Sequence, residues 1–232
     1  MAPIERPSPP LPSPGAVRRT LPRAAVVTAF VAVALVAAFG VLLRFTGAGP
    51  LGIDAWWSEA VSVQRGTAPY AVAVFLAQIG SGAGGAACVA ILAALCFAMR
   101  RPRDALSVAT AALFGVAASE AVKALVLRSR PSGSLYESFG ASYPSGHSMG
   151  AAVIAVSAAL IALGSERISA RLAQWIVAAA VLWIGVMMWS RTALHVHWLT
   201  DTIAGALLGM ACAILARRVW FGPRAVDVRG PA

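Results

Sequence analysis

Long apolar runs constrain this 232-residue chain more than any other feature of its sequence. The first run covers residues 24–43 and directly follows three arginines. Further runs lie at about 82–99, 104–127, 148–164, 173–190 and 198–216. Each is close to the roughly 17–25 residues that an α-helix needs to cross a bilayer. The runs therefore predict an all-α, polytopic membrane protein with six transmembrane helices.

The composition supports this class. The chain is 59% hydrophobic and 12% charged, whereas soluble domains are roughly 45–50% apolar and about 25% charged. A net charge of +10 would suggest nucleic-acid binding in a soluble protein, but here the arginines flank the apolar runs. We therefore expect no nucleic-acid partner. Three cysteines lie inside apolar runs and are expected to pack there as small apolar residues, namely Cys88, Cys96 and Cys212.

Proline-rich and charged segments set the expected domain limits. Residues 1–22 hold seven of the fourteen prolines and predict a disordered cytoplasmic tail. We expect a membrane domain over 23–217 and a second cytoplasmic tail over 218–232. The run at 24–43 is longer than the roughly 7–15-residue core of a signal peptide, so a retained anchor is predicted.

A short amphipathic helix is predicted between the first two spans. Apolar residues recur there at helical spacing, namely Ile53, Trp56, Trp57, Ala60 and Val61. Tryptophan is favoured at membrane interfaces, so this helix is expected to lie on the membrane surface.

The arginines predict the orientation of the spans. With six spans, both termini lie on one side of the membrane. That side and its loops would carry thirteen arginines, and the other side five. Because cytoplasmic segments are enriched in Lys and Arg, both termini are predicted to be cytoplasmic.

Three short blocks carry the polar chemistry, and this topology places all of them at the extracytoplasmic face. The first is Lys123 and, after six residues, Arg130-Pro131. The second is Pro144-Ser145-Gly146-His147. The third is Ser190-Arg191, then His197 after five residues and Asp201 after three more.

The residue types in these blocks suit the binding and transfer of a phosphoryl group. Lys123, Arg130 and Arg191 can stabilise the negative charge of phosphate oxygens. Ser145 is expected to cap the next helix, whose N-terminus favours an anion, and Gly146 allows close approach of the backbone. Three other arginines are read as ordinary interfacial cations, namely Arg44, Arg65 and Arg128.

Spacing selects one histidine as the candidate nucleophile. His197 and Asp201 are four residues apart at the start of a helical span, so they share a face. A carboxylate beside an imidazole fixes its tautomer, and a carboxylate within a span is expensive unless it has a functional partner. His195 has Leu199 at the corresponding position and is therefore disfavoured.

Two further features are interpreted as structural. Glu120 lies one helical turn before Lys123 and is expected to form an ion pair with it. Gly205 and Gly209 form a G-x-x-x-G pattern, which predicts close helix packing.

The three blocks resemble the signature of the type-2 phosphatidic acid phosphatase family, also called lipid phosphate phosphatases. That pattern is K-x6-R-P, P-S-G-H and S-R-x5-H-x3-D, and residues 123–201 match every fixed position in order. The resemblance implies that His197 is the nucleophile, Asp201 its orienting carboxylate and His147 the general acid. It further implies phosphate binding by Lys123, Arg130, Ser145, Gly146 and Arg191, with no metal and no cofactor.

The resemblance implies a membrane lipid phosphatase that works through a phosphohistidine on the outer face of the cell membrane. Prenyl pyrophosphate, phosphatidic acid and phosphatidylglycerophosphate are open as substrates. A lipid phosphotransferase with an acceptor other than water is the alternative enzyme, and a phospholipid-binding or transport protein is the non-catalytic alternative. The expected partners are a lipid phosphate and membrane lipids; the oligomeric state is left open.

Overall fold

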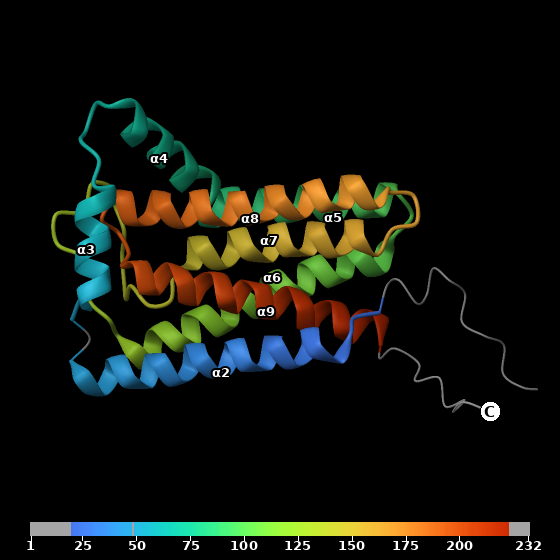
Figure 1. Ribbon diagram of the computed structural model, residues 1–232, viewed down its shortest axis with the longest axis horizontal. Coiled ribbons are helices and arrows are strands. Elements are labelled where there is room, and N and C mark those ends of the chain that lie inside the picture. The colour runs from blue at the N-terminus through green and yellow to red at the C-terminus, as the bar shows by residue number, and fades with distance from the viewer. Residues whose placement is uncertain (1–19, 48, 223–232) are drawn as a thin grey trace, which may run out of the picture.

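The computed structural model describes residues 20–47 and 49–222, so most of the two predicted tails lies outside the described residues. Within these ranges all regular secondary structure is helical, which confirms the predicted all-α class. The elements, labelled as in Figure 1, are α2 (Arg23–Thr46), α3 (Gly52–Val61), α4 (Ala68–Ile79), α5 (Gly82–Ala98), α6 (Pro102–Val126), α7 (Gly146–Leu163), α8 (Ala170–Ala193) and α9 (Leu199–Phe221).

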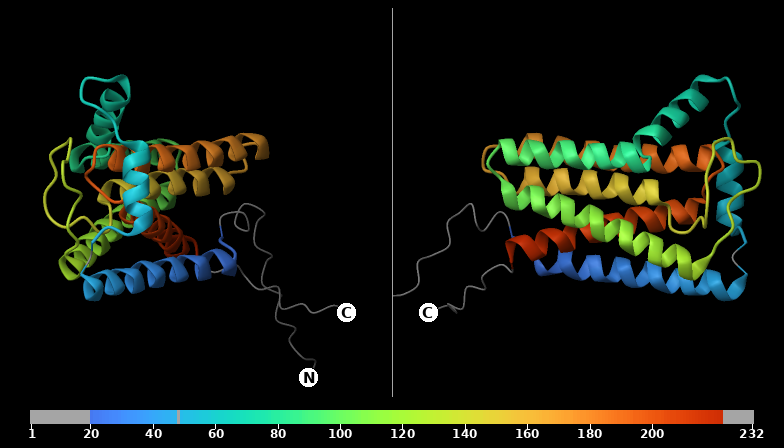
Figure 2. Two further views of the ribbon diagram at one scale, coloured as in Figure 1. Left: turned by 60° about the vertical axis from the view of Figure 1, so that its left-hand side comes forward. Right: turned by 180° about the vertical axis from the view of Figure 1, so that it is seen from behind.

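The long helices form a bundle with α7 and α9 at its centre. Helix α9 packs against α2, α6 and α7, and α7 packs against α6, α8 and α9. In the apolar part of each helix, 61% of α9 and 56% of α7 is buried, against 11% of α8. The start of α2 and the end of α9 lie at the same end of the bundle, and α3 lies across the opposite end (Figures 1 and 2). The peripheral helices therefore keep the apolar faces that a bilayer would cover.

The number of spans agrees with the sequence. Five helices are long and apolar enough to cross a membrane, and α4 with α5 forms a sixth candidate that is bent by 64°. Ser81 caps α5 at this bend, where its hydroxyl accepts a hydrogen bond from the Gly84 amide. A Cβ on Gly80 would lie 2.8 Å from the His147 ring and 2.9 Å from the Met187 methyl group. Glycine at the bend thus lets α4 lie directly beside α7 and α8.

Close contact between α7 and α9 fixes the centre of the bundle. A Cβ on Gly205 would collide with the Ser145 carbonyl, and one on Gly209 would collide with the Met149 carbonyl. The packing role predicted for this G-x-x-x-G pattern is confirmed. It brings the N-terminus of α7 against the first turns of α9.

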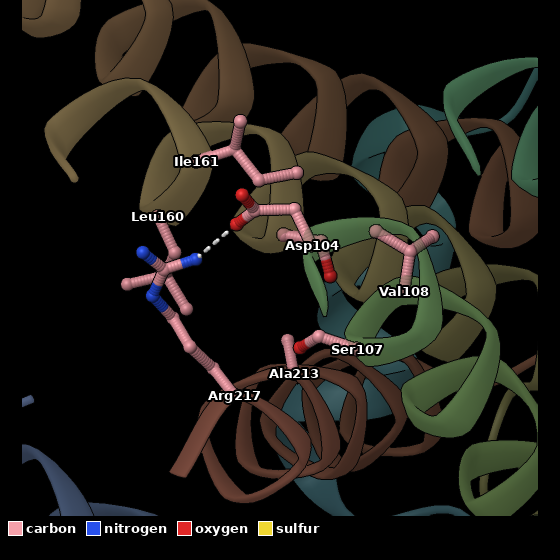
Figure 3. Close-up of a pocket in the computed structure, with 8 residues that line it drawn as sticks. Asp104, Ser107, Val108, Leu160, Ile161, Ala213 and Arg217 are labelled. Atoms are coloured by element: carbon pink, nitrogen blue, oxygen red, sulfur yellow. Dashed lines mark hydrogen bonds and ion pairs between the residues drawn. The ribbon is translucent and has the colours of Figure 1, made fainter. Parts of the chain in front are cut away.

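A buried ion cluster ties the helices together at the end where α2 begins. Asp104 on α6 accepts a hydrogen bond from Arg217 at 2.9 Å (Figure 3). It also accepts one from Arg101 at 2.8 Å. Figure 3 shows Arg217 reaching from α9 beside Leu160 toward this carboxylate. The cluster lies far from the three blocks along the bundle, so its role is in holding α6, α7 and α9 together.

The predicted short helix between the first two spans is present as α3. Asp54 is completely buried, whereas the predicted apolar residues Ile53 and Trp56 are 48% and 59% exposed. Trp57 donates an indole hydrogen bond to the Thr192 hydroxyl at 2.9 Å. Asp54 is buried because the end of the bundle offers α3 a buried cation, described below.

Candidate functional site

The three sequence blocks meet at the end of the bundle covered by α3. Lys123 lies in the last turn of α6, Arg191 in the last turn of α8 and Asp201 in the first turn of α9. Helix α7 begins deeper inside the bundle than the adjacent ends of α8 and α9 (Figures 1 and 2). Its first turn therefore forms the floor of the site, with the other blocks around it.

Helix α6 ends through a left-handed residue, and this directs the first block inward. Leu127 has a φ of 55°, and its amide donates to the Lys123 carbonyl at 3.1 Å. The chain leaves the helix there, four residues before Pro131 and close to the predicted end of this span at about residue 127. The early exit carries Arg128 and Arg130 onto the loop that faces α9.

His197 is held in one tautomer. Its Nδ1 lies 2.8 Å from the Ser142 carbonyl oxygen, which can only accept, so Nδ1 carries the proton. Its Nε2 lies 3.3 Å from the Arg130 guanidinium, which can only donate, so Nε2 holds a lone pair. Both contacts select the same neutral form, in which Nε2 is the nucleophilic atom.

The surroundings keep this imidazole neutral. Burial lowers the pKa of His197 to about 4, while the negative charge of Asp201 acts in the opposite direction. Arg130 and Arg191 lower the pKa further through their positive charge. A neutral ring with a free Nε2 lone pair is therefore the dominant form near pH 7.

Asp201 lies beside His197 on the same helix face, as its spacing predicts, but it does not take the Nδ1 proton directly. The distance from Nδ1 to the nearer carboxylate oxygen is 3.7 Å, longer than a hydrogen bond. Both carboxylate oxygens have other donors: the Trp198 amide at 2.9 Å and Arg128 at 2.6 Å. Asp201 thus acts on the imidazole mainly through its charge, while the Ser142 carbonyl fixes the tautomer.

Two arginines near His197 differ in how they are held. Arg130 is held by loop carbonyls, including those of Val196 at 2.7 Å and Phe139 at 2.8 Å. Arg191 is 1% exposed, and its Nε and Nη1 have no hydrogen-bond partner within the described residues. Buried guanidinium donors rarely stay unsatisfied, so these two nitrogen atoms are suited to bind an anion.

The second block forms the floor of the site. Ser145 caps α7, its hydroxyl accepting from the Ser148 amide, and its own amide donates to the Asp201 carbonyl at 3.0 Å. A Cβ on Gly146 would come 3.6 Å from the ammonium nitrogen of Lys123. The same ammonium lies 2.7 Å from Glu120, which confirms the predicted ion pair. The helix end and the lysine together offer a second anion-binding side.

His147 occupies the first turn of α7, next to the bend between α4 and α5. Its Nε2 lies 3.0 Å from the carbonyl oxygen of Ala77 in the last turn of α4, so Nε2 carries a proton. Arg191, His197 and Lys123 are all close enough to act on this ring electrostatically. The structure therefore brings all eight site residues expected from the sequence to one end of the bundle.

Two charged residues of this region escaped the sequence reasoning. Arg128, expected to be an interfacial cation, is 1% exposed and bridges Asp54 at 2.7 Å and Asp201 at 2.6 Å. The reading of Arg128 as a surface residue is wrong, because its partners come from two distant helices. A signal was available in the sequence, since Asp54, Trp57, Ser58 and Val61 share one helical face.

Comparisons with known proteins show the family and the fold. A model of the PAP2 superfamily matches residues 70–224, about two thirds of the chain. The fold is similar to that of a transmembrane PAP2-type phosphatidylglycerolphosphate phosphatase from Bacillus subtilis, with a TM-score of 0.70, 23% identity, and 88% of this chain and 98% of that chain covered. It is also similar to Aquifex aeolicus LpxE, with a TM-score of 0.58, 20% identity, and 72% and 95% covered. No curated protein matches the sequence.

Proposed function

Because the chain belongs to the PAP2 superfamily, we propose that it is a membrane lipid phosphatase that works through a phosphohistidine on His197. One observation carries the proposal. The Nε2 lone pair of a neutral, buried imidazole lies beside Arg130, and the unpartnered donors of Arg191 belong to the same site. This arrangement supplies a nucleophile and the cations that a phosphoryl group requires.

In the first step, Nε2 of His197 attacks phosphorus and the bond from phosphorus to the lipid oxygen breaks. The Nδ1 proton stays on the Ser142 side, so the phosphorylated ring carries a positive charge. Asp201, 3.7 Å away, stabilises that charge. Arg130, Arg191 and Lys123 hold the phosphate oxygens, on which negative charge is spread in the transition state.

His147 supplies the proton for the departing lipid oxygen. Its Nε2 proton points to the Ala77 carbonyl, so Nδ1 is the atom left to carry the proton to be donated. Water then attacks phosphorus, the bond to His197 breaks and His147 takes up the proton of that water. The products are the dephosphorylated lipid and inorganic phosphate.

The substrate is proposed to be a prenyl pyrophosphate, phosphatidic acid or phosphatidylglycerophosphate.

The end of the bundle opposite the site carries eight arginines in the described residues, and the site end carries five. Three of those five, at positions 128, 130 and 191, belong to the site itself. The positive-inside rule therefore supports cytoplasmic termini and an extracytoplasmic site.

The direct test is the release of inorganic phosphate from a panel of these three lipid classes in detergent micelles. His197→Ala should abolish release while the far-UV circular dichroism spectrum stays that of the wild type. His195→Ala is the matched control and should keep most of the activity. An active His197→Ala protein, or an inactive His195→Ala protein beside it, would contradict the assignment of the nucleophile.

The absence of a metal requirement is tested in the same assay. Within residues 20–47 and 49–222, no three His, Cys, Asp or Glu side chains gather in a way that could hold a metal ion. We expect phosphate release to be unchanged by EDTA. Activity that disappears with EDTA and returns with a divalent cation would argue for different chemistry.

A further inference from the structure

Behind the nucleophile lies a buried chain of charges that extends to α3. We propose that Asp54 and Arg128 are positioning residues for the reaction, which hold Asp201 in place and set the charge that His197 experiences. The inference rests on the proposed phosphatase function and deepens it. Neither residue occupies a fixed position of the three blocks, and α3 precedes the segment that the family model matches.

Hydrogen bonds from Arg128 hold this group of buried charges together. One terminal nitrogen donates to Asp201 at 2.6 Å and to the Thr200 hydroxyl at 2.7 Å. The other donates to Asp54 at 2.7 Å and to the Gly49 carbonyl at 3.1 Å. The side chains of all three charged residues are 0% exposed. Buried charges in such contacts keep one geometry, because each alternative leaves a charge without a partner.

Asp54 must be a carboxylate for this arrangement. Its Oδ1 accepts from the Thr200 amide at 2.9 Å, and its Oδ2 accepts from Arg128 and from the Leu51 amide at 3.2 Å. An asparagine would turn an N–H group toward one of these donors. Asp54 therefore links three groups: the first turn of α9 through Thr200, the start of its own helix through Leu51, and Arg128.

The charge balance gives Asp54 a function beyond packing. Arg128 and Asp201 alone would form a neutral pair beside His197. With Asp54 the group carries one net negative charge, which favours the positive ring that forms when Nε2 takes the phosphoryl group. This charge opposes Arg130 and Arg191, the two cations that act on His197 from the loop and from α8. Asp54 thus restores the negative field that Arg128 would otherwise cancel.

The test compares two acids on the same helix. Asp54→Asn should lower kcat by about 10–100-fold with little change in KM, the range typical of residues that position a reacting group. Glu59→Gln removes an equal charge from an exposed position of α3 and should leave kcat unchanged. In an Asp201→Asn background, Asp54→Asn should lower kcat by a clearly smaller factor, because Asp54 then no longer holds a carboxylate beside His197. Equal losses in both backgrounds would mean a purely structural role and overturn the proposal.

A second measurement does not depend on activity. The chain has three histidines, so nitrogen-labelled histidine spectra can be assigned with single substitutions. The titration of the His197 ring should move to lower pH in Asp54→Asn and stay at the wild-type position in Glu59→Gln. A shift without any phosphatase activity in the wild type would support the charge network and refute the proposed function. No shift in an active protein would overturn the inference alone.

A milder variant covers the case in which Asp54→Asn does not fold in detergent. Thr200→Val keeps the shape of the side chain but removes the hydroxyl that contacts both Arg128 and Asp54. We expect a smaller fall in kcat in the same direction, with an unchanged circular dichroism spectrum. A folded Thr200→Val protein with wild-type kcat would then refute the proposal.

Discussion

Arg128 provides the sharpest test of what holds the site together. Arg128→Met removes the cation between Asp54 and Asp201 while keeping an unbranched apolar side chain. Two carboxylates then remain fully buried with no opposite charge between them. Breaking a buried ion pair in this way costs about 3–5 kcal/mol, whereas an exposed pair contributes about 0–1 kcal/mol. We expect the free energy of unfolding to fall by about 3–5 kcal/mol.

The assay is unfolding in mixed micelles by titration with sodium dodecyl sulfate, followed by far-UV circular dichroism. Arg44→Met is the matched control, because Arg44 lies in the last turn of α2 at the same end of the bundle and is exposed. Its free energy of unfolding should change by no more than about 0.5 kcal/mol. A loss below about 1 kcal/mol for Arg128→Met would mean that Arg128 does not hold the two buried carboxylates together.

A double variant tests whether Arg128 and Asp54 depend on each other for stability. Without Arg128, the buried carboxylate of Asp54 has no opposite charge beside it and destabilises the fold. Removing that charge should therefore recover part of the lost stability. The double variant Arg128→Met with Asp54→Asn should therefore lose less than the sum of the two single variants. Strict additivity would mean that the two side chains do not depend on each other.

Three other predictions follow from the same structure. Burial lowers the pKa of His197 to about 4 from 6.5, so between these values the unfolded chain binds a proton that the folded chain does not. The unfolding free energy should therefore fall as the pH drops from 6.5 to 4, and His197→Asn should remove this part of the slope. Gly209→Ala should cost about 1–3 kcal/mol through overpacking, whereas Gly185→Ala, with open space around its Cα, should be neutral or stabilising in the same titration. Trp57→Phe removes the hydrogen bond to Thr192 and should cost about 1 kcal/mol, detected as faster proteolysis of α3; an unchanged cleavage rate would contradict that docking role.

Much of the fold could be predicted because its signals are local. Apolar runs identified the spans, since a bilayer requires a continuous length of apolar helix. The break between α4 and α5 coincides with a glycine-rich stretch, and the G-x-x-x-G pattern of α9 marks its contact with α7. These features depend on neighbours in the chain, so the order of residues is enough to find them.

The candidate site could also be predicted only where its signals are local in the sequence. The spacing of His197 and Asp201 placed them on one helix face, and the count of spans placed all three blocks at one end. The acceptor for the Nδ1 proton could not be read in this way, because the Ser142 carbonyl is a backbone group and every residue has one. The left-handed backbone conformation of Leu127 could not be predicted either, since leucine carries no preference for it.

The class of protein, the number of spans and the chemical groups of the site can all be read from the order of residues. Only the tertiary structure decided that Arg128 is buried and that Asp54, on a helix expected to rest on the membrane surface, faces it. The physical reason is that an arginine can be buried only where opposite charges and hydrogen-bond acceptors surround it. The partners of Arg128, Asp54 and Asp201, are 74 and 73 residues away in the chain. The sequence around Arg128 therefore does not reveal that it is buried.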